Sequence, residues 1–117
     1  MFTPRAAVRV FLCLEPVDMR LSFDRLAALA RDVMDLDPAG GHLFLFRARR
    51  RDRLKILYWD EDGYALWYKR HEAGTFHIPA PRDGNAHVTL TSAELSLLLA
   101  GVDLATTRKR PRWRKPA

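Results

Sequence analysis

The fold is decided by residues 42–71, which read HLFLFRARRRDRLKILYWDEDGYALWYKRH. Three apolar and aromatic runs, 42–48, 53–59 and 64–71, are separated by two polar four-residue segments. Runs of this length between turn residues are typical of β-strands. The second polar segment ends at Gly63, where we expect the turn to need a positive φ. The stretch therefore predicts two successive hairpins, which make an antiparallel meander.

Turns of four residues fix a register between the strands. The expected pairs are Phe44 with Leu57, Ala48 with Arg53, Lys55 with Tyr68, and Trp59 with Tyr64. Because side chains alternate along a strand, two sheet faces follow. The more aliphatic face carries Leu43, Leu45, Arg47, Leu54, Ile56, Tyr58, Ala65, Trp67 and Lys69. The other carries Phe44, Phe46, Arg53, Lys55, Leu57, Trp59, Tyr64, Leu66, Tyr68 and Arg70.

We expect both helices of the protein to pack on the aliphatic face. The second face mixes aromatic rings with cations, a combination that can stack bases and neutralise phosphates. The same rings are also common in ordinary sheet cores, and a change of one residue in either turn would exchange the two faces. Both interpretations of the aromatic face stay open at this point.

Upstream of the meander, the sequence predicts a strand over residues 6–14 and a helix over residues 22–35. Pro16 ends the strand, since proline donates no main-chain hydrogen bond. Ser22 is the expected N-cap, with a hydroxyl that accepts from the first helical turn. The helix has apolar residues at helical spacing, namely Phe23, Leu26, Leu29 or Ala30, and Val33.

Downstream of the meander, residues 72–90 have no regular pattern, although Phe76 and Ile78 fit a short edge strand. A second helix is expected over residues 92–99, because Thr91 and Glu94 have the spacing of a capping box. Its apolar stripe is Leu95, Leu98, Leu99 and Val102. We expect an α+β fold in which residues 1–105 form one domain and residues 106–117 form a flexible basic tail.

The composition fits a globular protein, with 117 residues, 48% hydrophobic and 29% charged. The single cysteine, Cys13, excludes an internal disulfide framework and lies in an apolar run, where a buried thiol is expected. No stretch reaches the ~18 apolar residues of a membrane span. Residues 1–10 lack the order of a signal peptide. We therefore expect a cytoplasmic protein without membrane contact.

Positive charge is concentrated in two short runs that hold twelve of the twenty basic residues. The runs are Arg47, Arg49, Arg50, Arg51, Arg53 and Lys55, and Arg108, Lys109, Arg110, Arg112, Arg114 and Lys115. Elsewhere eight basic residues face thirteen acidic ones. Concentrated charge attracts polyanions, of which nucleic acid is the commonest in a cell. The alternative is a solvated turn followed by a charged tail.

Five blocks of sequence, in order, resemble a known family. They are Asp18-Met19-Arg20 with Phe23-Asp24-Arg25-Leu26, Gly41 to Arg50, Leu54 to Asp60 with Gly63, Lys69 to Phe76 with Pro79, and Leu90 to Leu99 with Gly101-Val102-Asp103. From about Val8 to Asp103 the chain resembles the Orf2-like accessory proteins, called TnpB, of IS66-type bacterial insertion sequences. It does not resemble the unrelated RNA-guided nucleases of the same name. Arg25 stands where a small residue is usual, and His71 where a leucine is common.

The resemblance implies a role in transposition beside a separate, larger transposase that carries the catalytic carboxylates, and it assigns no catalytic residue here. We therefore expect a non-catalytic accessory protein that needs no cofactor or metal and contacts nucleic acid, in the first place DNA. The expected contacts are the twelve cations of the two runs, together with Lys69, Arg70 and Trp113.

Two other functions stay open. In the first, the protein is an interaction module whose aliphatic sheet face docks the transposase, and the cations are incidental. In the second, it is a metal nuclease, which needs several carboxylates around Mg²⁺. Asp18, Asp24, Asp60 and Asp62 are available, but Asp60 and Asp62 share one turn, and the four histidines lack zinc spacing. Asp18-Met19-Arg20 itself reads either as a loop in which Asp18 and Arg20 pair or cap the helix start, or as a docking site for a partner.

Overall fold

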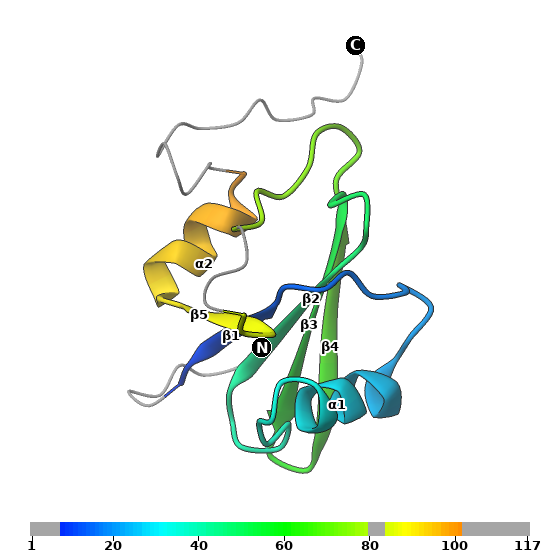
Figure 1. Ribbon diagram of the computed structural model, residues 1–117, viewed down its shortest axis with the longest axis vertical. Helices are drawn as coiled ribbons and strands as arrows, with labels where there is room; N and C mark the ends of the chain where they lie inside the picture. The colour runs from blue at the N-terminus through cyan, green and yellow to red at the C-terminus, as the bar shows by residue number, and fades with distance from the viewer. Residues whose placement is uncertain (1–7, 80–83, 102–117) are drawn as a thin grey trace.

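A five-stranded sheet with one helix on each face makes up the fold (Figure 1). The computed structural model describes residues 8–79 and 84–101. The elements are β1 (Val10–Cys13), α1 (Phe23–Asp32), β2 (Leu43–Arg47), β3 (Arg53–Asp60), β4 (Gly63–Arg70), β5 (His87–Leu90) and α2 (Ser92–Leu99). The strand order is β4-β3-β2-β1-β5. The predicted α+β class is confirmed.

The meander β2-β3-β4 is confirmed in the predicted register. Phe44 pairs with Leu57, and Lys55 pairs with Tyr68. The prediction about the second turn was wrong in one respect, because the residue with positive φ is Glu61, at 57°, rather than Gly63. Gly63 already belongs to β4 and pairs with Asp60, so the loop itself has only two residues.

Strands β1 and β5 complete the sheet on the other side of β2. β1 pairs in parallel with β2 and antiparallel with β5, so it lies inside the sheet. It is shorter than the predicted strand 6–14, of which residues 6 and 7 lie outside the described chain. The prediction that residues 72–90 are irregular was wrong for β5. Phe76 and Ile78 form no strand, but both are buried.

The prediction that both helices share one face was wrong. α2 packs Leu95 and Leu98 on the aliphatic face, among Leu45, Leu54 and Ile56. α1 packs Leu26, Ala27 and Ala30 on the opposite face, against Phe44, Phe46 and Leu57. The physical reason is that the centre of each face is apolar and needs a cover. α1 is the crossover between the parallel strands β1 and β2, which places it on the face that α2 leaves open.

The predictions about the helix caps and apolar stripes are confirmed only in part. α2 has the predicted capping box, in which Glu94 N donates to Thr91 Oγ1 and Thr91 N donates to Glu94 Oε1. Ser22 does occupy the N-cap position of α1, but its side chain makes no capping hydrogen bond. The predicted apolar stripe was wrong at both ends, since Phe23 and Val33 are 43% and 46% exposed. Val102 of the predicted α2 stripe lies outside the described residues.

Candidate nucleic-acid interface

A groove of about 430 Å³ lies between the β1–α1 connection and the β2–β3 hairpin. We call it the arginine groove, because three of its lining residues are arginines. One wall is made of Pro16, Val17, Asp18 and Met19, and the other of Ala48, Arg49, Arg50 and Arg53. The groove thus joins the first basic run to the Asp18-Met19-Arg20 block, two features that lie far apart in the sequence.

The main chain holds the hairpin tip in place from two sides. Arg51 N donates to Ala48 O at 3.0 Å, which closes the turn, and Arg51 itself has a φ of 61°. On the other side, Phe76 N donates to Arg51 O and His71 N donates to Asp52 O, both at 2.7 Å. The tip is therefore a fixed loop from which arginine side chains project.

The side chains of Arg49, Arg50 and Arg51 are exposed at this tip. Within residues 8–79 and 84–101, none of the three forms an ion pair with a carboxylate. Arg53 is half-buried and lies 3.6 Å from Asp52, a distance at which the pairing is weak. Unpaired guanidinium groups beside a groove are suited to phosphate, since each presents a planar fork of donors.

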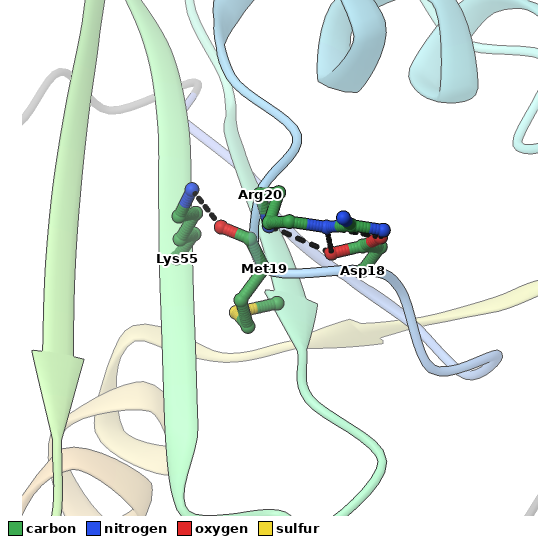
Figure 2. A network of polar contacts seen from close by, with 4 residues as sticks. All are labelled: Asp18, Met19, Arg20 and Lys55. Carbon is green, nitrogen blue, oxygen red and sulfur yellow. Dashed lines mark hydrogen bonds and ion pairs between the residues drawn. The ribbon is translucent and has the colours of Figure 1, made fainter.

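Lys55 is not a surface contact, and its assignment as a phosphate ligand was wrong. The side chain is 6% exposed, and Nζ donates to Met19 O at 2.7 Å and to Leu21 O at 2.6 Å. Nζ also lies 4.8 Å from the centre of the Tyr68 ring. Figure 2 shows the ammonium group of Lys55 directed from its strand at the Met19 carbonyl. A buried ammonium with carbonyl acceptors has a structural role. Its charge is already stabilised by protein groups, so it is not available to a phosphate.

Arg47 has a similar structural role at the end of β2. Its Nη2 donates to Leu14 O at 2.7 Å, while Val17 N donates to Arg47 O at 2.9 Å. Burial lowers the pKa of the Arg47 guanidinium, and neighbouring Arg51 lowers it further. Arg47 and Lys55 therefore fasten the β1–α1 connection to the sheet, and this attachment positions the loop wall of the arginine groove.

Asp18 and Arg20 form a pair, which is one of the roles that the sequence left open for this block (Figure 2). Asp18 accepts from the Arg20 main-chain N–H at 2.9 Å and from Nη2 at 2.7 Å. These hydrogen bonds, the side-chain one first, lower the pKa of Asp18 from 3.8 to about 2. The acid that lines the arginine groove is thus charged at neutral pH and already paired with a cation.

The remaining predicted contacts fall into two groups. Arg70 pairs with Arg53 across β3 and β4, and Lys69 pairs with Leu54, so both lie at the hairpin-tip end of the sheet. Arg70 also forms an exposed ion pair of 2.9 Å with Glu72. The tail positions Arg108, Lys109, Arg110, Arg112, Trp113, Arg114 and Lys115 lie outside the described residues.

The aromatic face is not an open stacking platform, so that interpretation was wrong for its centre. Phe44, Phe46 and Leu57 are fully buried beneath α1. Trp59 packs edge-on against Tyr64 with ring centres 5.0 Å apart, at the end of β3 far from Arg53. Of the rings that sequence reasoning placed beside nucleic acid, Phe44 and Phe46 are therefore used by the core, whereas Trp59 and Tyr68 are exposed.

The candidate nuclease acids are distributed along the sheet. Asp18 lines the arginine groove with Arg53, at the start of β3, whereas Asp60 ends the same strand. Seven residue steps separate Arg53 from Asp60, roughly 23 Å at the usual rise of a strand. Within residues 8–79 and 84–101, no three His, Cys, Asp or Glu side chains are placed to share a metal ion.

No helix in the part of the chain that the structure describes is long and apolar enough to cross a membrane.

Sequence reasoning missed the loop wall of the groove, Pro16, Val17 and Met19. One feature of the strand pattern does indicate that another segment packs there, namely the position of Lys55. Lys55 falls on the sheet face that also carries Phe44 and Leu57, in the middle of an apolar strand. A lysine at such a position needs acceptors supplied by another segment, and here the carbonyls of the β1–α1 loop supply them.

Comparison with known proteins supports the resemblance seen in the sequence. A family model described as IS66 Orf2 like protein matches residues 8–109. The uncharacterized protein y4jC of Sinorhizobium fredii (strain NBRC 101917 / NGR234) is 38% identical over 111 residues, which cover 95% of this chain and 93% of that protein. The uncharacterized protein y4hO of the same strain is 36% identical over 109 residues, 93% of this chain and 85% of that protein. No solved structure matches. The chain therefore belongs to the family of IS66 Orf2 like proteins.

Proposed function

We propose that this protein is a non-catalytic accessory factor of insertion-sequence transposition that contacts the DNA backbone through the arginine groove. Membership of the IS66 Orf2-like family supports the insertion-sequence role. The observation that carries the DNA contact is that Arg49, Arg50 and Arg53 line one groove at a hairpin tip held by main-chain hydrogen bonds. Cations fixed in this way bind phosphate without first losing loop entropy.

The proposed contact surface differs from the one expected from the sequence alone. Lys55 and Arg47 leave it, because Lys55 is buried and Arg47 is partly buried, and Lys55 Nζ and Arg47 Nη2 donate to main-chain carbonyls of the fold. Arg51 extends the surface from the tip, and Lys69 and Arg70 extend it along β4. In the proposal, the tail cations from Arg108 to Lys115 follow further phosphates, and Trp113 stacks on a base. Contacts of this kind fix position rather than sequence, and they depend strongly on salt.

We propose the transposase of the same element as the protein partner. The alternative function, in which the aliphatic sheet face docks the transposase without nucleic acid, has a smaller surface available, because the centre of that face is covered. Leu45, Leu54 and Ile56 of that face are at most 2% exposed beneath α2. On this face a partner would be left with the rim around Trp67, which is 36% exposed. The arginine groove is therefore the surface that we propose for DNA.

The test is a fluorescence anisotropy titration against element-end duplex, random duplex and single strand, at low and moderate salt. The key variant is Arg49→Glu with Arg50→Glu. Its matched control is Arg25→Glu with Arg31→Glu, which makes the same change of net charge on the exposed surface of α1. We expect the groove variant to lose binding and the control to retain it.

Two results would contradict the proposal. If the unchanged protein binds none of the three ligands at low salt, the nucleic-acid function is wrong. If both double variants lose affinity equally, net charge rather than the groove is responsible. The non-catalytic part is tested separately with Mg²⁺ and the same duplexes, where cleavage that disappears in Asp18→Asn or Asp60→Asn would identify a nuclease.

A further inference from the structure

The outer edge of β4 is long, and among residues 8–79 and 84–101 no strand pairs with it. β4 ends the sheet on one side (Figure 1), and all eight of its residues pair one-to-one with β3, so the strand contains no bulge. It contains no proline, and its only charged residues are Lys69 and Arg70 at one end. The other edge, β5, has four residues. Natural proteins usually protect a long edge with proline, bulges or central charges, since a bare edge recruits another strand.

The register identifies which main-chain groups this edge presents. His71 N donates to Asp52 O at 2.7 Å, which places the odd-numbered residues of β4 in hydrogen-bonded pairs with β3. The N–H and C=O groups of Tyr64, Leu66, Tyr68 and Arg70 therefore point away from the sheet. Within residues 8–79 and 84–101, no turn or loop forms a main-chain hydrogen bond with these outward N–H and C=O groups.

Aromatic side chains flank the same edge on both faces of the sheet. Trp67 is 36% exposed on the aliphatic face, and Tyr68 is 49% exposed on the α1 face. Two large rings at the middle of an edge strand add apolar area that a neighbouring strand would cover. Cross-strand aromatic pairs of this kind stabilise a sheet.

The charges around β4 are self-complementary. The chain just before the strand is acidic, with Asp60 at the end of β3 and Glu61 and Asp62 in the turn, and the strand ends in Lys69 and Arg70. If two copies of β4 pair antiparallel with Leu66 opposite Leu66, Asp62 of each copy lies opposite Arg70 of the other. The pair between Arg70 and Glu72 within one chain is exposed and weak, so it leaves Arg70 able to contact a second carboxylate.

We propose that two copies of this chain associate through antiparallel pairing of β4 with β4 about a two-fold axis. The sheet then continues across the interface, and the outward N–H and C=O groups of each strand are satisfied by the other. A second copy fits better than an unrelated strand. In the antiparallel pair, the acidic turn of each copy faces the basic end of β4 in the other copy. This isologous arrangement closes on itself and leaves no further β4 edge. It does not depend on the proposed binding of DNA.

The first test measures mass by sedimentation over a wide range of protein concentration. We expect a concentration-dependent dimer. Trp67→Lys places a cation in the middle of each strand and should raise the dimer dissociation constant by at least about tenfold, because charge in an edge strand opposes pairing. The control is Leu97→Lys, which changes a residue of similar exposure, 38%, on α2 and should not alter the dimer. Circular dichroism confirms that each variant is folded.

A charge exchange tests the alignment. Asp62→Lys should weaken the dimer, and adding Arg70→Asp should restore it, because the exchanged charges again lie opposite each other.

A second measurement reads the interface directly by amide hydrogen exchange. The amides of Leu66 and Tyr68 should gain protection as the dimer forms, whereas those of Ala65 and Trp67, already paired with β3, should not change. A protein that stays monomeric at every concentration overturns the proposal. So does a dimer that survives Trp67→Lys, or an edge that becomes protected only when another protein is added.

Discussion

The Nζ atom of Lys55 lies 2.7 Å from the carbonyl oxygen of Met19, in the loop that forms one wall of the arginine groove (Figure 2). This bond joins the middle of the sheet to a segment 36 residues earlier in the chain. Lys55 is buried, so its charge is stabilised by the two carbonyls and the Tyr68 ring rather than by water. A cation that looks like a phosphate ligand in the sequence instead shapes the site at which phosphate is proposed to bind.

Replacing Lys55 by methionine should therefore destabilise the protein. Methionine fills a similar volume but leaves the carbonyls of Met19 and Leu21 without their donor. We expect the free energy of unfolding to fall by about 2 kcal/mol, since hydrogen bonds to charged groups contribute about that much and the acceptors lose their partner. Urea denaturation measures the change. Lys69→Met on β4 is the control and should have a much smaller effect, because Lys69 is partly exposed and its ammonium makes no hydrogen bond within residues 8–79 and 84–101. Equal stabilities for the two variants would show that Lys55 does not hold the loop.

The pairings of the meander could be predicted because they depend on local information. Turn length fixes the register, so Phe44 opposite Leu57 and Lys55 opposite Tyr68 follow from the spacing of the apolar runs. The capping box of Thr91 and Glu94 is local in the same way. Neither feature requires knowledge of what lies elsewhere in the chain.

The errors in sheet topology and in the candidate site concern contacts between distant segments. Cys13 pairs with His87, and nothing in the four residues of β5 specifies that partner. The sheet face that α1 covers depends on the parallel pairing of β1 with β2, and no turn sequence indicates that pairing. For the candidate site, the exposed arginines of the tip could be predicted, but the loss of Lys55 and Arg47 to main-chain carbonyls could not. Their acceptors lie more than thirty residues away.

The two helix N-termini offer a matched comparison of capping. Thr91→Ala removes the Oγ1 acceptor of the Glu94 amide and should cost about 1 kcal/mol of stability, the usual effect of losing a capping side chain. Ser22→Ala should be close to neutral, because the Ser22 hydroxyl makes no capping bond. Urea denaturation of both variants checks the difference. A larger loss for Ser22→Ala would mean that α1 is capped in solution by the hydroxyl after all.

The Asp18–Arg20 pair predicts a dependence of stability on pH. The folded protein holds the pKa of Asp18 at about 2, below its ordinary value of 3.8, because Arg20 donates to the carboxylate. A depressed pKa means that the unfolded chain binds the proton more tightly. The pair therefore contributes stability above the ordinary pKa, and this contribution is lost as the pH falls through the folded value.

Asp18→Asn isolates the contribution of the Asp18–Arg20 pair to the free energy of unfolding. The stability difference between the unchanged protein and the variant should be present at about pH 6 and should shrink as the pH is lowered towards about 2. The effect should be modest, because the pair is exposed to solvent. Urea denaturation at several pH values measures it, and an NMR titration of the Asp18 carboxyl gives the pKa directly. A titration midpoint at the ordinary value would show that the pair does not persist in solution.

The salt dependence of DNA binding separates the residues that touch phosphate from those that only shape the groove. Each phosphate neutralised by a cation changes the slope of log K against log salt by about 0.9. Arg49→Ala and Arg50→Ala should therefore each reduce the magnitude of the slope by about 0.9, since both side chains are exposed in the groove. Lys55→Met should leave the slope of the folded protein unchanged, because its ammonium is already occupied. Anisotropy titrations at several salt concentrations give the slopes. A slope reduced by Lys55→Met as much as by Arg50→Ala would place Lys55 at the phosphate and contradict the structural role assigned to it.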